Sequence, residues 1–525
     1  MVTTVAVRPV RLVPPVHPDT AADLQALHDR LPKAGLSLWL VRHKWGLAVA
    51  IADSGPGTTV ANAVMRVLAD LRGNGFDWVL AAPGIARVGR SGDPSRWVEL
   101  EHWNISAHSV TGVRANALTR EQFDVADVEP VMVELFGRRW PTLAGMFDAH
   151  TDDVVHDIDV VFSYVDGTDP AFLSRRADWL ARAVLGDGDG ADARIRQIDE
   201  LRYALRSVDQ HAPWVRQIFI ATDSRLPGWL IADHPKIAIV RASEHFTDPA
   251  ALPTFNSHAV ESQLHHIDGL AEHFLYCNDD MFFGRPAAAS MFFTPAGVSR
   301  FIESPIRIGG GTVNPSRSGH ENAARNNRRL LAERFGYLIT RHLAHSPVAL
   351  RRSVLAELEA EFPREFAATQ ASRFRSATDI SVTNSLYHYY ALLTGRAVPH
   401  ESARACYIDT TSRDGLSLLA DLSVRHDADF FCLNDGSEPE VDETHRARAV
   451  SDFLASYFPY PAPWELAGTA PCDQLGEAKW RGTRGASGMT IPACSSRACA
   501  CCAVTASPTV GPLSTGTTEC ITVSG

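Results

Sequence analysis

Four short apolar runs between residues 156 and 279 alternate with segments of helical periodicity, and this alternation constrains the fold most strongly. The runs are DIDVVFSYVDG, VRQIFIAT, KIAIVRAS and HFLYCND. After the first run comes DELRYALRSVDQHAPW, in which Leu201, Leu205 and Val208 fall on one helical face. β-rich runs joined by helices predict an α/β fold with a largely parallel sheet and crossover helices. Ligands of such sheets bind at the carboxyl ends of the strands, so we expect functional residues there.

Polar side chains that could bind a cation follow three apolar runs, in the segments VDG, NDD and LNDG. They are Asp166, Asp279, Asp280, Asn434 and Asp435. Mg²⁺ and Mn²⁺ prefer oxygen ligands and are commonly bridged between carboxylates and substrate phosphates. A turn that closes a strand uses the same residue types, because Asp and Asn side chains bond to nearby backbone. The pattern alone leaves a metal or nucleotide site and an ordinary turn both open.

The predicted helix DELRYALRSVDQHAPW also carries cationic side chains. Arg202, Arg206 and Asp209 fall on a second face of it. Exposed arginines four residues apart are most often only a solvated helix face. Next to a phosphate, the same guanidinium groups would bind it through paired hydrogen bonds.

The segment PTFNSHAVESQLHHIDGL combines a helix start at Asn256 with His258, Glu261 and His265 on one helical face. A zinc site of this kind needs a further ligand, and the HExxH spacing is absent, so the pattern disfavours zinc. The alternative is that Glu261 is a polar or acid–base group that faces the same pocket as the NDD segment.

Later segments add a histidine and several arginines. His345 stands before Ser-Pro in RHLAHSP, and its ordinary pKa near neutral pH suits a general base. An ordinary surface histidine is the alternative. Arginines that could meet a phosphate occur in ENAARNNRRLL and SRFRS, and they are Arg325, Arg328, Arg329, Arg373 and Arg375.

The overall charge argues against nucleic-acid binding. The chain has 50 Lys and Arg against 61 Asp and Glu, a formal net charge of −11, whereas nucleic-acid backbones are bound by an excess of basic residues. The N-terminus lacks the apolar stretch of a signal peptide, and the most apolar segment, 36–52, is too short to span a bilayer. We expect a cytoplasmic protein with at most peripheral association with the inner face of the membrane.

Composition divides the chain into three parts. Residues 1–150 alternate strand-like runs with helical periodicity and predict a small accessory α/β domain. Residues 156–465 form the main domain, and its part at about 300–400 is expected to be mostly helical. There VALRRSVLAELEAEF has helical spacing at Val348, Leu355 and Leu358. Residues 466–525 are rich in Cys, Ala, Ser, Thr and Gly and predict a disordered tail.

Cysteine placement disfavours a disulfide framework in the main domain. Cys277, Cys406 and Cys432 are scattered through it, so we expect reduced thiols there. In the tail, CSSRACACC has neither a paired CxxC spacing nor a nearby histidine, which disfavours a structural zinc site.

Taken in order, these segments resemble the Stealth family of sugar-phosphate transferases, which includes bacterial capsule and exopolysaccharide phosphotransferases and the animal lysosomal-enzyme N-acetylglucosamine-1-phosphotransferase. The resemblance covers about residues 156 to 465. The matching blocks lie at 158–170, 199–286, 345–381 and 432–436, and the second is long and specific. The family implies a glycosyltransferase-A-like fold for the main domain, which would be the catalytic one.

The resemblance also implies a reaction. A hexose-1-phosphate, typically an N-acetylhexosamine-1-phosphate, passes from a UDP-sugar donor to a hydroxyl of a polysaccharide or oligosaccharide acceptor in capsule or exopolysaccharide synthesis. The acceptor attacks the β-phosphorus, so that the anomeric bond survives and the products are a phosphodiester and UMP. A divalent cation, Mg²⁺ or Mn²⁺, is the expected cofactor, and no nucleic-acid partner is expected.

Carried over residue by residue, the resemblance places Glu261, Asp280, His345 and Arg375 at the reacting phosphate. His345 would be the general base, and Arg375 would offset phosphoryl charge. The implied metal ligands are Asp279, Asp280, Asn434 and Asp435. The implied substrate-binding residues are Asp166, Arg202, Arg206, Asn256, Arg325 and Arg373. The chain departs from the family pattern at Ile198, where Asn is usual, and in HSP, where HAP or HMP is common.

Two rival functions remain open on the sequence. A glycosyltransferase on the same scaffold would transfer the sugar alone and release UDP. A carbohydrate-binding module without catalysis would be unaffected by Asp280→Asn or His345→Ala. The nucleotide product separates the first rival from phosphotransfer.

Overall fold

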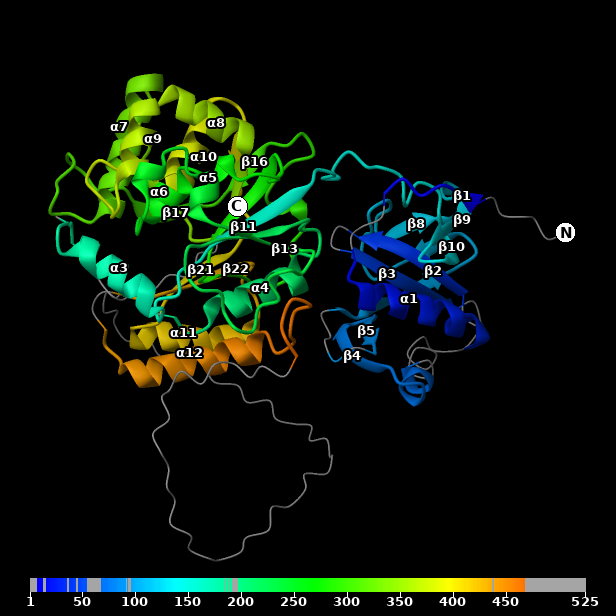
Figure 1. Cartoon of the computed structure of the whole chain (residues 1–525). Coiled ribbons are helices and arrows are strands. Elements are labelled where there is room, and N and C mark those ends of the chain that lie inside the picture. The colour runs from blue at the N-terminus through cyan, green and yellow to red at the C-terminus, as the bar shows by residue number, and fades with distance from the viewer. Residues whose placement is uncertain are drawn as a thin grey trace, which may run out of the picture.

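The computed structural model describes residues 7–467, apart from gaps at 13–15, 35–36, 44–45, 54–67, 91, 93–95, 184, 188, 191–196 and 437–438. Figure 1 shows the first 150 residues, in blue and cyan, as one body beside a larger body that begins near residue 158. The tail expected to be disordered, 466–525, lies outside the described residues except for its first two positions.

The N-terminal body contains a seven-stranded sheet and a three-stranded sheet. The first joins β2 (Ser37–His43), β3 (Gly46–Asp53), β6 (Val98–Ile105), β5 (Ile85–Gly89) and β4 (Asp77–Ala82), with β7 (Ser109–Thr111) and β8 (Gln122–Asp124) at one side. The second joins β1 (Val7–Arg8), β9 (Pro130–Leu135) and β10 (Arg138–Leu143). Its described helices include α1 (Pro18–Arg30), η1 (Leu31–Ala34) and η3 (Val125–Asp127), and residues 68–73 are also helical. The buried apolar residues of this body form a core of their own, around Leu24, Val49 and Trp140.

The larger body is built on a five-stranded sheet. Its order is β13 (Ile237–Val240), β12 (Ile218–Ala221), β11 (Ile158–Ser163), β14 (His273–Asn278) and β19 (Val348–Arg351). The first four strands run parallel, and β19 lies antiparallel at the edge. Helices cover both faces of such a sheet, so its strands are apolar runs buried on both sides. The predicted mostly parallel sheet with crossover helices is confirmed.

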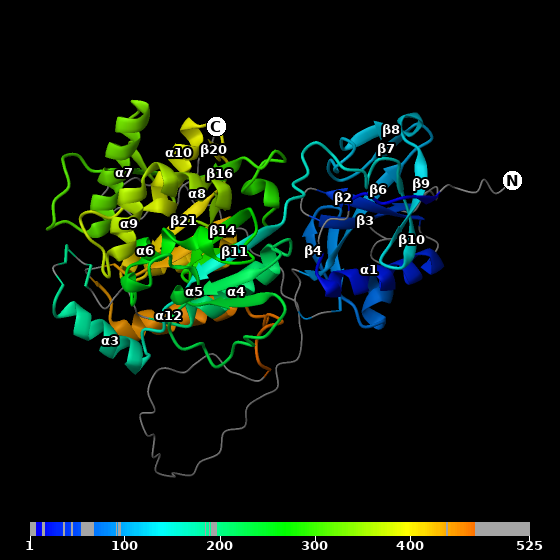
Figure 2. The same ribbon diagram turned by 45° about the horizontal axis from the view of Figure 1, so that its top comes forward.

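Alternate residues of the central strands face two separate cores. Val160 and Phe162 pack with α4 (Glu200–His211) on one side. Val161 packs on the other side with the helices of residues 319–393. This alternation follows from the two-residue repeat of a strand. Figure 2 shows the two helical layers with the sheet between them.

The helical part of this body is confirmed, with one correction. It contains α7 (Gly319–Phe335), α8 (Arg352–Glu361), α9 (Pro363–Ala371), η8 (Val382–Leu386) and α10 (Tyr387–Leu393). Val348 was expected on the helix of Leu355 and Leu358, and this is wrong because Val348 pairs with Tyr276 as part of strand β19. Pairing with β19 gives the backbone N–H and C=O groups at the edge of β14 their hydrogen-bond partners. The helix α8 therefore begins only at Arg352.

A small sheet continues from the carboxyl end of β14. It consists of β15 (Met281–Phe283), β22 (Phe430–Asn434) and β21 (Ala405–Asp409), with β22 antiparallel to β15 and parallel to β21. Two further pairs are β16 (Ser299–Phe301) with β20 (Ala397–Pro399), and β17 (Glu303–Arg307) with β18 (Arg341–Leu343). The remaining helices are α3 (Pro170–Leu180), α5 (Ala242–His245), η5 (Pro249–Ala251), α6 (Ser257–Glu261), η6 (Leu264–His266), η7 (Ala289–Met291), α11 (Arg413–Arg425) and α12 (Glu443–Tyr457).

The cysteines of the larger body do not all match the expectation. Cys277 and Cys432 are free and buried. Cys406 is disulfide-bonded, so the expectation of reduced thiols throughout this body is wrong at that position.

None of the helices among the described residues is long and apolar enough to cross a membrane.

Candidate functional site

Four carboxylates meet where β14 ends. Asp279 and Asp280 form the turn between β14 and β15, and Leu433 N–H donates to the backbone oxygen of Asp280 at 3.0 Å. This contact places Asp435, which follows β22, beside the turn. Glu200, the first residue of α4, completes the group. The position agrees with the expectation that functional residues gather at the carboxyl ends of the strands.

Burial makes Asp279, Asp280 and Glu200 harder to ionise, and neighbouring carboxylates add to this effect at Asp280 and Glu200. Burial, with the charges of Asp279 and Asp435, raises the pKa of Asp280 to about 7. Burial raises the pKa of Asp279 to about 6, against a hydrogen bond that it accepts from Gln197. Burial, with the charges of Asp279 and Asp280, raises the pKa of Glu200 to about 8. Carboxylates crowded in this way are stabilised by a cation.

The hydrogen bonds of Asp280 leave room for such a cation. Its Oδ1 is buried and has no hydrogen-bond partner among the described residues. The Cys432 thiol donates a hydrogen bond to the same carboxyl group. Because a buried carboxylate oxygen without a partner is costly, this atom suits a metal ligand. The residues at the turn therefore fit the expected Mg²⁺ or Mn²⁺.

Asp435 and Asn434 have different surroundings. Asp435 Oδ1 accepts hydrogen bonds from Arg446 at 2.6 Å and from Thr410 at 3.3 Å. Asn434 ends β22 opposite Asp409, and its backbone oxygen accepts from Thr410 N–H. Asp435 is thus held in an ion pair that fixes its position near Asp280, while metal binding by Asn434 stays a prediction.

Asp166 forms the turn that the sequence left open as an alternative. Its Oδ1 accepts hydrogen bonds from the backbone and hydroxyl of Thr168, at 2.9 and 2.6 Å. Its Oδ2 accepts from Arg225 at 3.3 Å. Burial, followed by the charges of Asp166 and Asp279, raises the pKa of Tyr164. Asp166 therefore lies on the same edge as the carboxylate group, and its contact with a nucleotide stays a prediction.

Three histidines and one arginine form a second cluster, in which His320 opens α7, His342 and His345 lie in and just after β18, and Arg375 lies in the loop after α9. His345 is partly buried, and burial with the charges of His342 and Arg375 lowers its pKa to about 4. His320 and His342 stack with ring centroids 5.1 Å apart. Arg375 donates to Ser257 Oγ at 2.8 Å. The imidazole of His345 is consequently neutral at working pH and can accept a proton.

The small sheet brings His345 and Asp280 to one side. The His345 ring contacts Tyr407 of β21, with ring centroids 4.9 Å apart. Tyr407 is the register partner of Cys432 on the parallel strand β22, so both side chains point to the same face. Cys432 bonds to Asp280 on that face. The predicted base and the predicted metal ligand therefore share one side of the small sheet.

Glu261 lies beside the last residues of β14. It is buried, and its Oε2 accepts a hydrogen bond from Thr383 at 2.6 Å. Burial and then the charge of Glu261 raise the pKa of Tyr276. The Tyr276 hydroxyl donates to Asn278 at 3.1 Å, next to the carboxylate turn. The expectation that one helix presents His258, Glu261 and His265 together is wrong, since α6 ends at Glu261 and His265 belongs to the separate turn η6.

Arg202 and Arg206, which the family resemblance implies to be substrate-binding residues, do not lie on an exposed helix face, and their substrate-binding role stays a prediction. Both are buried, at 2% and 5% exposure. Glu465 accepts from Arg202 Nε at 2.6 Å and from Arg206 Nε and Nη2 at 2.6 and 2.8 Å, while Arg206 Nη1 donates to Phe458 O at 2.7 Å. The guanidinium groups predicted to hold a phosphate are thus occupied by a carboxylate from the end of the body.

Asn256, Arg325 and Arg373 also use their polar groups within the protein. Asn256 caps α6 with Oδ1 and donates to Ser372 O and Asp379 Oδ2 through Nδ2. Arg325 donates to Gly310 O and Glu321 O. Arg373 donates to Ala250 O and lies over the Trp179 ring at 4.1 Å. These contacts hold loops in place, and Asn256 in particular holds the loop that carries Arg375. The substrate-binding roles expected for the three residues stay predictions.

Sequence reasoning missed Glu200 and His320. Glu200 stands inside the DELR segment, one residue before Leu201, and a carboxylate that opens a helix after a strand end was the available signal. His320 opens α7, and burial together with Arg375, His342, His258 and His345 lowers its pKa well below the ordinary value. Nothing in its sequence context marked it.

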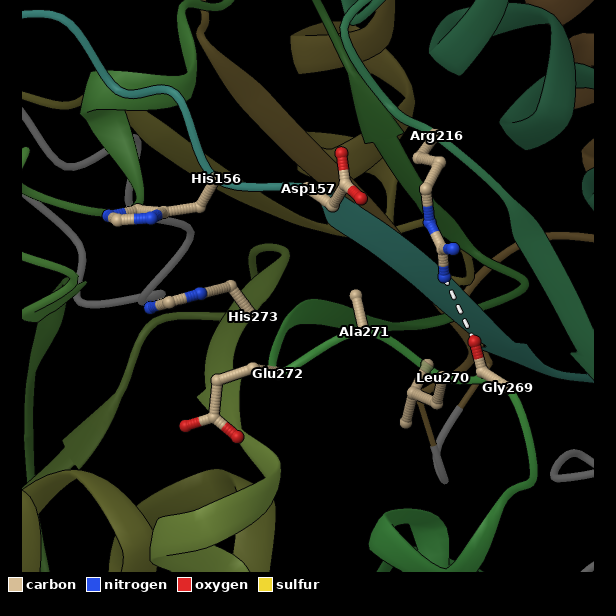
Figure 3. A pocket seen from close by; sticks show the side chains of 8 residues that line it. All are labelled: His156, Asp157, Arg216, Gly269, Leu270, Ala271, Glu272 and His273. Atoms are coloured by element: carbon tan, nitrogen blue, oxygen red, sulfur yellow. Dashed lines mark hydrogen bonds between the residues drawn. The ribbon is translucent and has the colours of Figure 1, made fainter.

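A cavity of about 410 Å³ lies at the other end of the central sheet. It is lined at the amino ends of β11 and β14 by His156, Asp157, Arg216, Gly269, Leu270, Ala271, Glu272 and His273. Figure 3 shows His156 and His273 side by side, with ring centroids 4.4 Å apart, and the hydrogen bond from Arg216 to Gly269 O. None of the predicted site residues lines it.

Comparison with known proteins gives three family matches. Stealth protein conserved region 2 matches residues 194–301, conserved region 3 matches 344–392, and conserved region 4 matches 422–472. These ranges include Glu200, Glu261 and the Asp279–Asp280 turn in the first, His345 and Arg375 in the second, and Asp435 in the third.

Named relatives are similar over most of their length. An exopolysaccharide phosphotransferase of Nocardia farcinica is 61% identical over 446 residues, which are 85% of this chain and 87% of that protein. Exopolysaccharide phosphotransferase CpsY of Mycobacterium tuberculosis is 62% identical over 384 residues, 73% of this chain and 71% of that protein. Among solved structures, the galactosyltransferase LgtC aligns at 10% identity with a TM-score of 0.29, over 58% of this chain and 98% of that one. That likeness is too low to carry an argument.

Proposed function

The chain belongs to the Stealth family, and on that premise we propose that it transfers a hexose-1-phosphate from a UDP-sugar to a hydroxyl of a polysaccharide acceptor. It is a transferase, and its relatives are named exopolysaccharide phosphotransferases. The transferred unit is an N-acetylhexosamine-1-phosphate, and the reaction belongs to capsule or exopolysaccharide synthesis. The products are a phosphodiester and UMP.

The proposal rests mainly on one observation: a cluster of four carboxylates lies on the same side of the small sheet as a neutral histidine with an arginine beside it. Asp279, Asp280, Glu200 and Asp435 supply concentrated negative charge at the end of β14. His345 lies near Arg375 and packs against Tyr407, on the side of the small sheet where the Cys432 thiol donates to Asp280. Phosphoryl transfer needs charge neutralisation and positioning of the reactants, and this arrangement offers both.

The cluster of four carboxylates at the end of β14 is the binding site for Mg²⁺ or Mn²⁺. Asp279 and Asp280 would hold the ion, with Glu200 and Asp435 close enough to contribute directly or through water. Asp280 is the first candidate metal ligand among these residues, because its Oδ1 is buried without a hydrogen-bond partner among the described residues. When bound, the ion neutralises charge on the diphosphate of the donor.

The remaining residues handle the acceptor and the transferred phosphoryl group. His345 accepts the proton of the attacking hydroxyl, and its Nδ1 or Nε2 keeps that proton as the new P–O bond forms. Arg375, oriented by its bond to Ser257, offsets the charge of the phosphoryl oxygens. The bond from the β-phosphorus to the bridging oxygen breaks, and that oxygen leaves with UMP. A donor diphosphate next to His345 raises the pKa of the imidazole toward neutrality, which makes it a better base.

Glu261 is proposed as a polar or acid–base group at the same phosphate. Its carboxylate accepts a hydrogen bond from Thr383 and lies near Tyr276, whose hydroxyl donates to Asn278 at the end of β14. Asp166 would lie near the nucleotide, and Arg325 and Arg373 would act mainly through the loops that they hold.

We further propose roles for the parts around this site. Residues 1–150 form an accessory domain that helps to bind acceptor or partner, and residues 156–465 form the catalytic domain. Arg96 of the accessory domain contacts the catalytic domain through an ion pair with Asp209 at 2.6 Å. The enzyme works in the cytoplasm, at most in peripheral contact with the inner face of the membrane.

The nucleotide product tests the proposal. The purified protein is incubated with UDP-N-acetylglucosamine, Mg²⁺ and candidate acceptors, and the nucleotide is identified by chromatography. We expect UMP together with a phosphodiester product. UDP as the sole nucleotide would overturn the proposal in favour of simple glycosyl transfer. Undiminished function of Asp280→Asn and His345→Ala would favour a carbohydrate-binding module.

A further inference from the structure

Two neighbouring histidines and a glutamate from another helix meet on the helical face of the central sheet. His265 and His266 belong to the short turn η6, and Glu359 lies near the end of α8. Both Nε2 atoms lie close to the same carboxylate oxygen, Glu359 Oε2, at 2.8 Å from His265 and 2.9 Å from His266. The two rings have their centroids 4.0 Å apart. Two nitrogen atoms and one oxygen atom that could each bind a metal thus lie close together.

The backbone around this cluster is held in place by separate contacts. Arg352 donates through Nε to His265 O at 3.2 Å and through Nη1 to Leu270 O at 2.9 Å. Arg352 and Glu359 are seven residues apart in α8 and lie on the same helical face. One face of α8 therefore fixes the backbone of η6 with its arginine and meets the two histidine rings with its glutamate.

The two separations between histidine nitrogen and glutamate oxygen, 2.8 and 2.9 Å, are close to those of a tetrahedral metal site. Zinc binds His nitrogen and Glu oxygen at about 2.0–2.2 Å, which separates two ligand atoms by about 3.3 Å. The ligand atoms of the three residues all lie within 4.8 Å of one another. The two His–Glu contacts need to widen by only about half an ångström to admit the ion.

We propose that His265, His266 and Glu359 bind a zinc ion that joins η6 to α8, with the fourth position open to water. The side chains of His266 and Glu359 are 32% and 27% exposed, so water reaches that position, whereas His265 is buried. Imidazole nitrogens favour zinc, while the all-oxygen group at Asp279 and Asp280 favours magnesium or manganese. The two sites therefore select different metals.

The zinc site would act through the positions of other residues. η6 lies in the crossover between α6, which carries Glu261, and β14, which leads to the carboxylate turn. The ion would tie this crossover to α8. The expected role is to stabilise the fold and not to touch the reacting phosphate.

Metal titration of the full-length protein tests this site. Accessible thiols are blocked with N-ethylmaleimide, so that cysteines of the tail do not bind zinc. Excess Mg²⁺ is added to occupy the cluster of carboxylates at Asp279 and Asp280. After treatment with a chelator, Zn²⁺ is titrated by calorimetry and Co²⁺ by absorption spectroscopy. We expect one bound Zn²⁺ and a Co²⁺ spectrum without the intense thiolate charge-transfer bands. Zn²⁺ should also raise the midpoint of thermal unfolding.

Variants identify the ligands. Glu359→Gln and His266→Gln should each weaken Zn²⁺ binding at least tenfold and abolish the thermal shift. His445→Gln, which changes an exposed histidine of α12, is the matched control and should bind as the unchanged protein does. Far-ultraviolet circular dichroism checks folding, and His266→Gln carries the test if Glu359→Gln does not fold, since His266 is partly exposed.

Equal Zn²⁺ affinity in both variants and the unchanged protein would overturn the site, as would the absence of bound Zn²⁺. In either case the three residues form only an ion pair. Neither result depends on the nucleotide product, so the zinc site and the proposed transfer reaction can fail independently.

Discussion

Replacing Asp280 by Asn should stabilise the metal-free protein and at the same time abolish turnover. Burial and the charges of Asp279 and Asp435 raise the pKa of Asp280 from its ordinary 3.8 to about 7. The ionised carboxylate is therefore a destabilising group when no cation is bound. Asn removes the charge, keeps nearly the same volume and can still accept a hydrogen bond from Cys432.

The size of the effect follows from the pKa. Each pKa unit corresponds to about 1.4 kcal/mol, so a rise from 3.8 to about 7 costs at most about 4 kcal/mol. Because the folded pKa is the higher one, the unfolded chain releases the proton first as pH rises. The cost is absent below about pH 4, grows between pH 4 and 7, and is complete above pH 7. Partial solvent access makes the real value smaller.

Urea unfolding with a chelator present measures this difference. We expect the free energy of unfolding of Asp280→Asn to exceed that of the unchanged protein by about 1–4 kcal/mol at pH 8 and to match it near pH 4. Saturating Mg²⁺ should stabilise the unchanged protein and close the gap. Asp421→Asn, which changes an exposed carboxylate of α11, is the control and should show no such pH dependence. A variant less stable than the unchanged protein at pH 8, or one with near-normal turnover, would refute the reasoning.

Four further experiments probe the site and its support. Glu465→Ala should lower the free energy of unfolding by about 3–5 kcal/mol in urea, because it leaves two buried arginines without their carboxylate; a loss below 1 kcal/mol would contradict the importance of this ion pair. His345→Ala should reduce kcat by about 10²–10⁴-fold with little change in donor KM, the ratio expected for a general base, and an unchanged kcat would remove His345 from that role. Arg375→Lys should lower kcat at least tenfold in steady-state assays, since Lys lacks the paired donors of the guanidinium group; equal activity would show that a simple positive charge suffices there. Raising the Mg²⁺ concentration should move the acidic limb of the kcat/KM profile to lower pH, because the ion competes with protons for Asp279 and Asp280, and a limb that does not respond to Mg²⁺ would argue against metal binding at that turn.

Local sequence patterns were sufficient to predict the edge of the sheet at which polar residues gather. Asp279 and Asp280 follow an apolar run, and the carboxyl ends of parallel strands meet at one edge. The family resemblance added His345 and Arg375, which no local pattern singles out from other histidines and arginines. Their catalytic roles stay predictions that the kinetic experiments address.

Local patterns failed where the partner is distant in the chain. Arg202 and Arg206 have the spacing of an exposed helix face, but Glu465, about 260 residues later, covers them. Val348 fits a helical repeat, yet pairing with Tyr276 makes it a strand. In both cases a long-range contact outweighs a local preference.

Sequence alone determined where the four parallel strands of the larger body lie along the chain and where carboxylates follow strands, because two-residue and 3.6-residue repeats are local properties of the chain. Only the tertiary structure decided which of those charges are paired and which are crowded together. Glu200 became part of the carboxylate group, and Arg202 became part of the core. Burial and proximity set the pKa of a side chain, and both depend on residues that are far away in the sequence and close together in the fold.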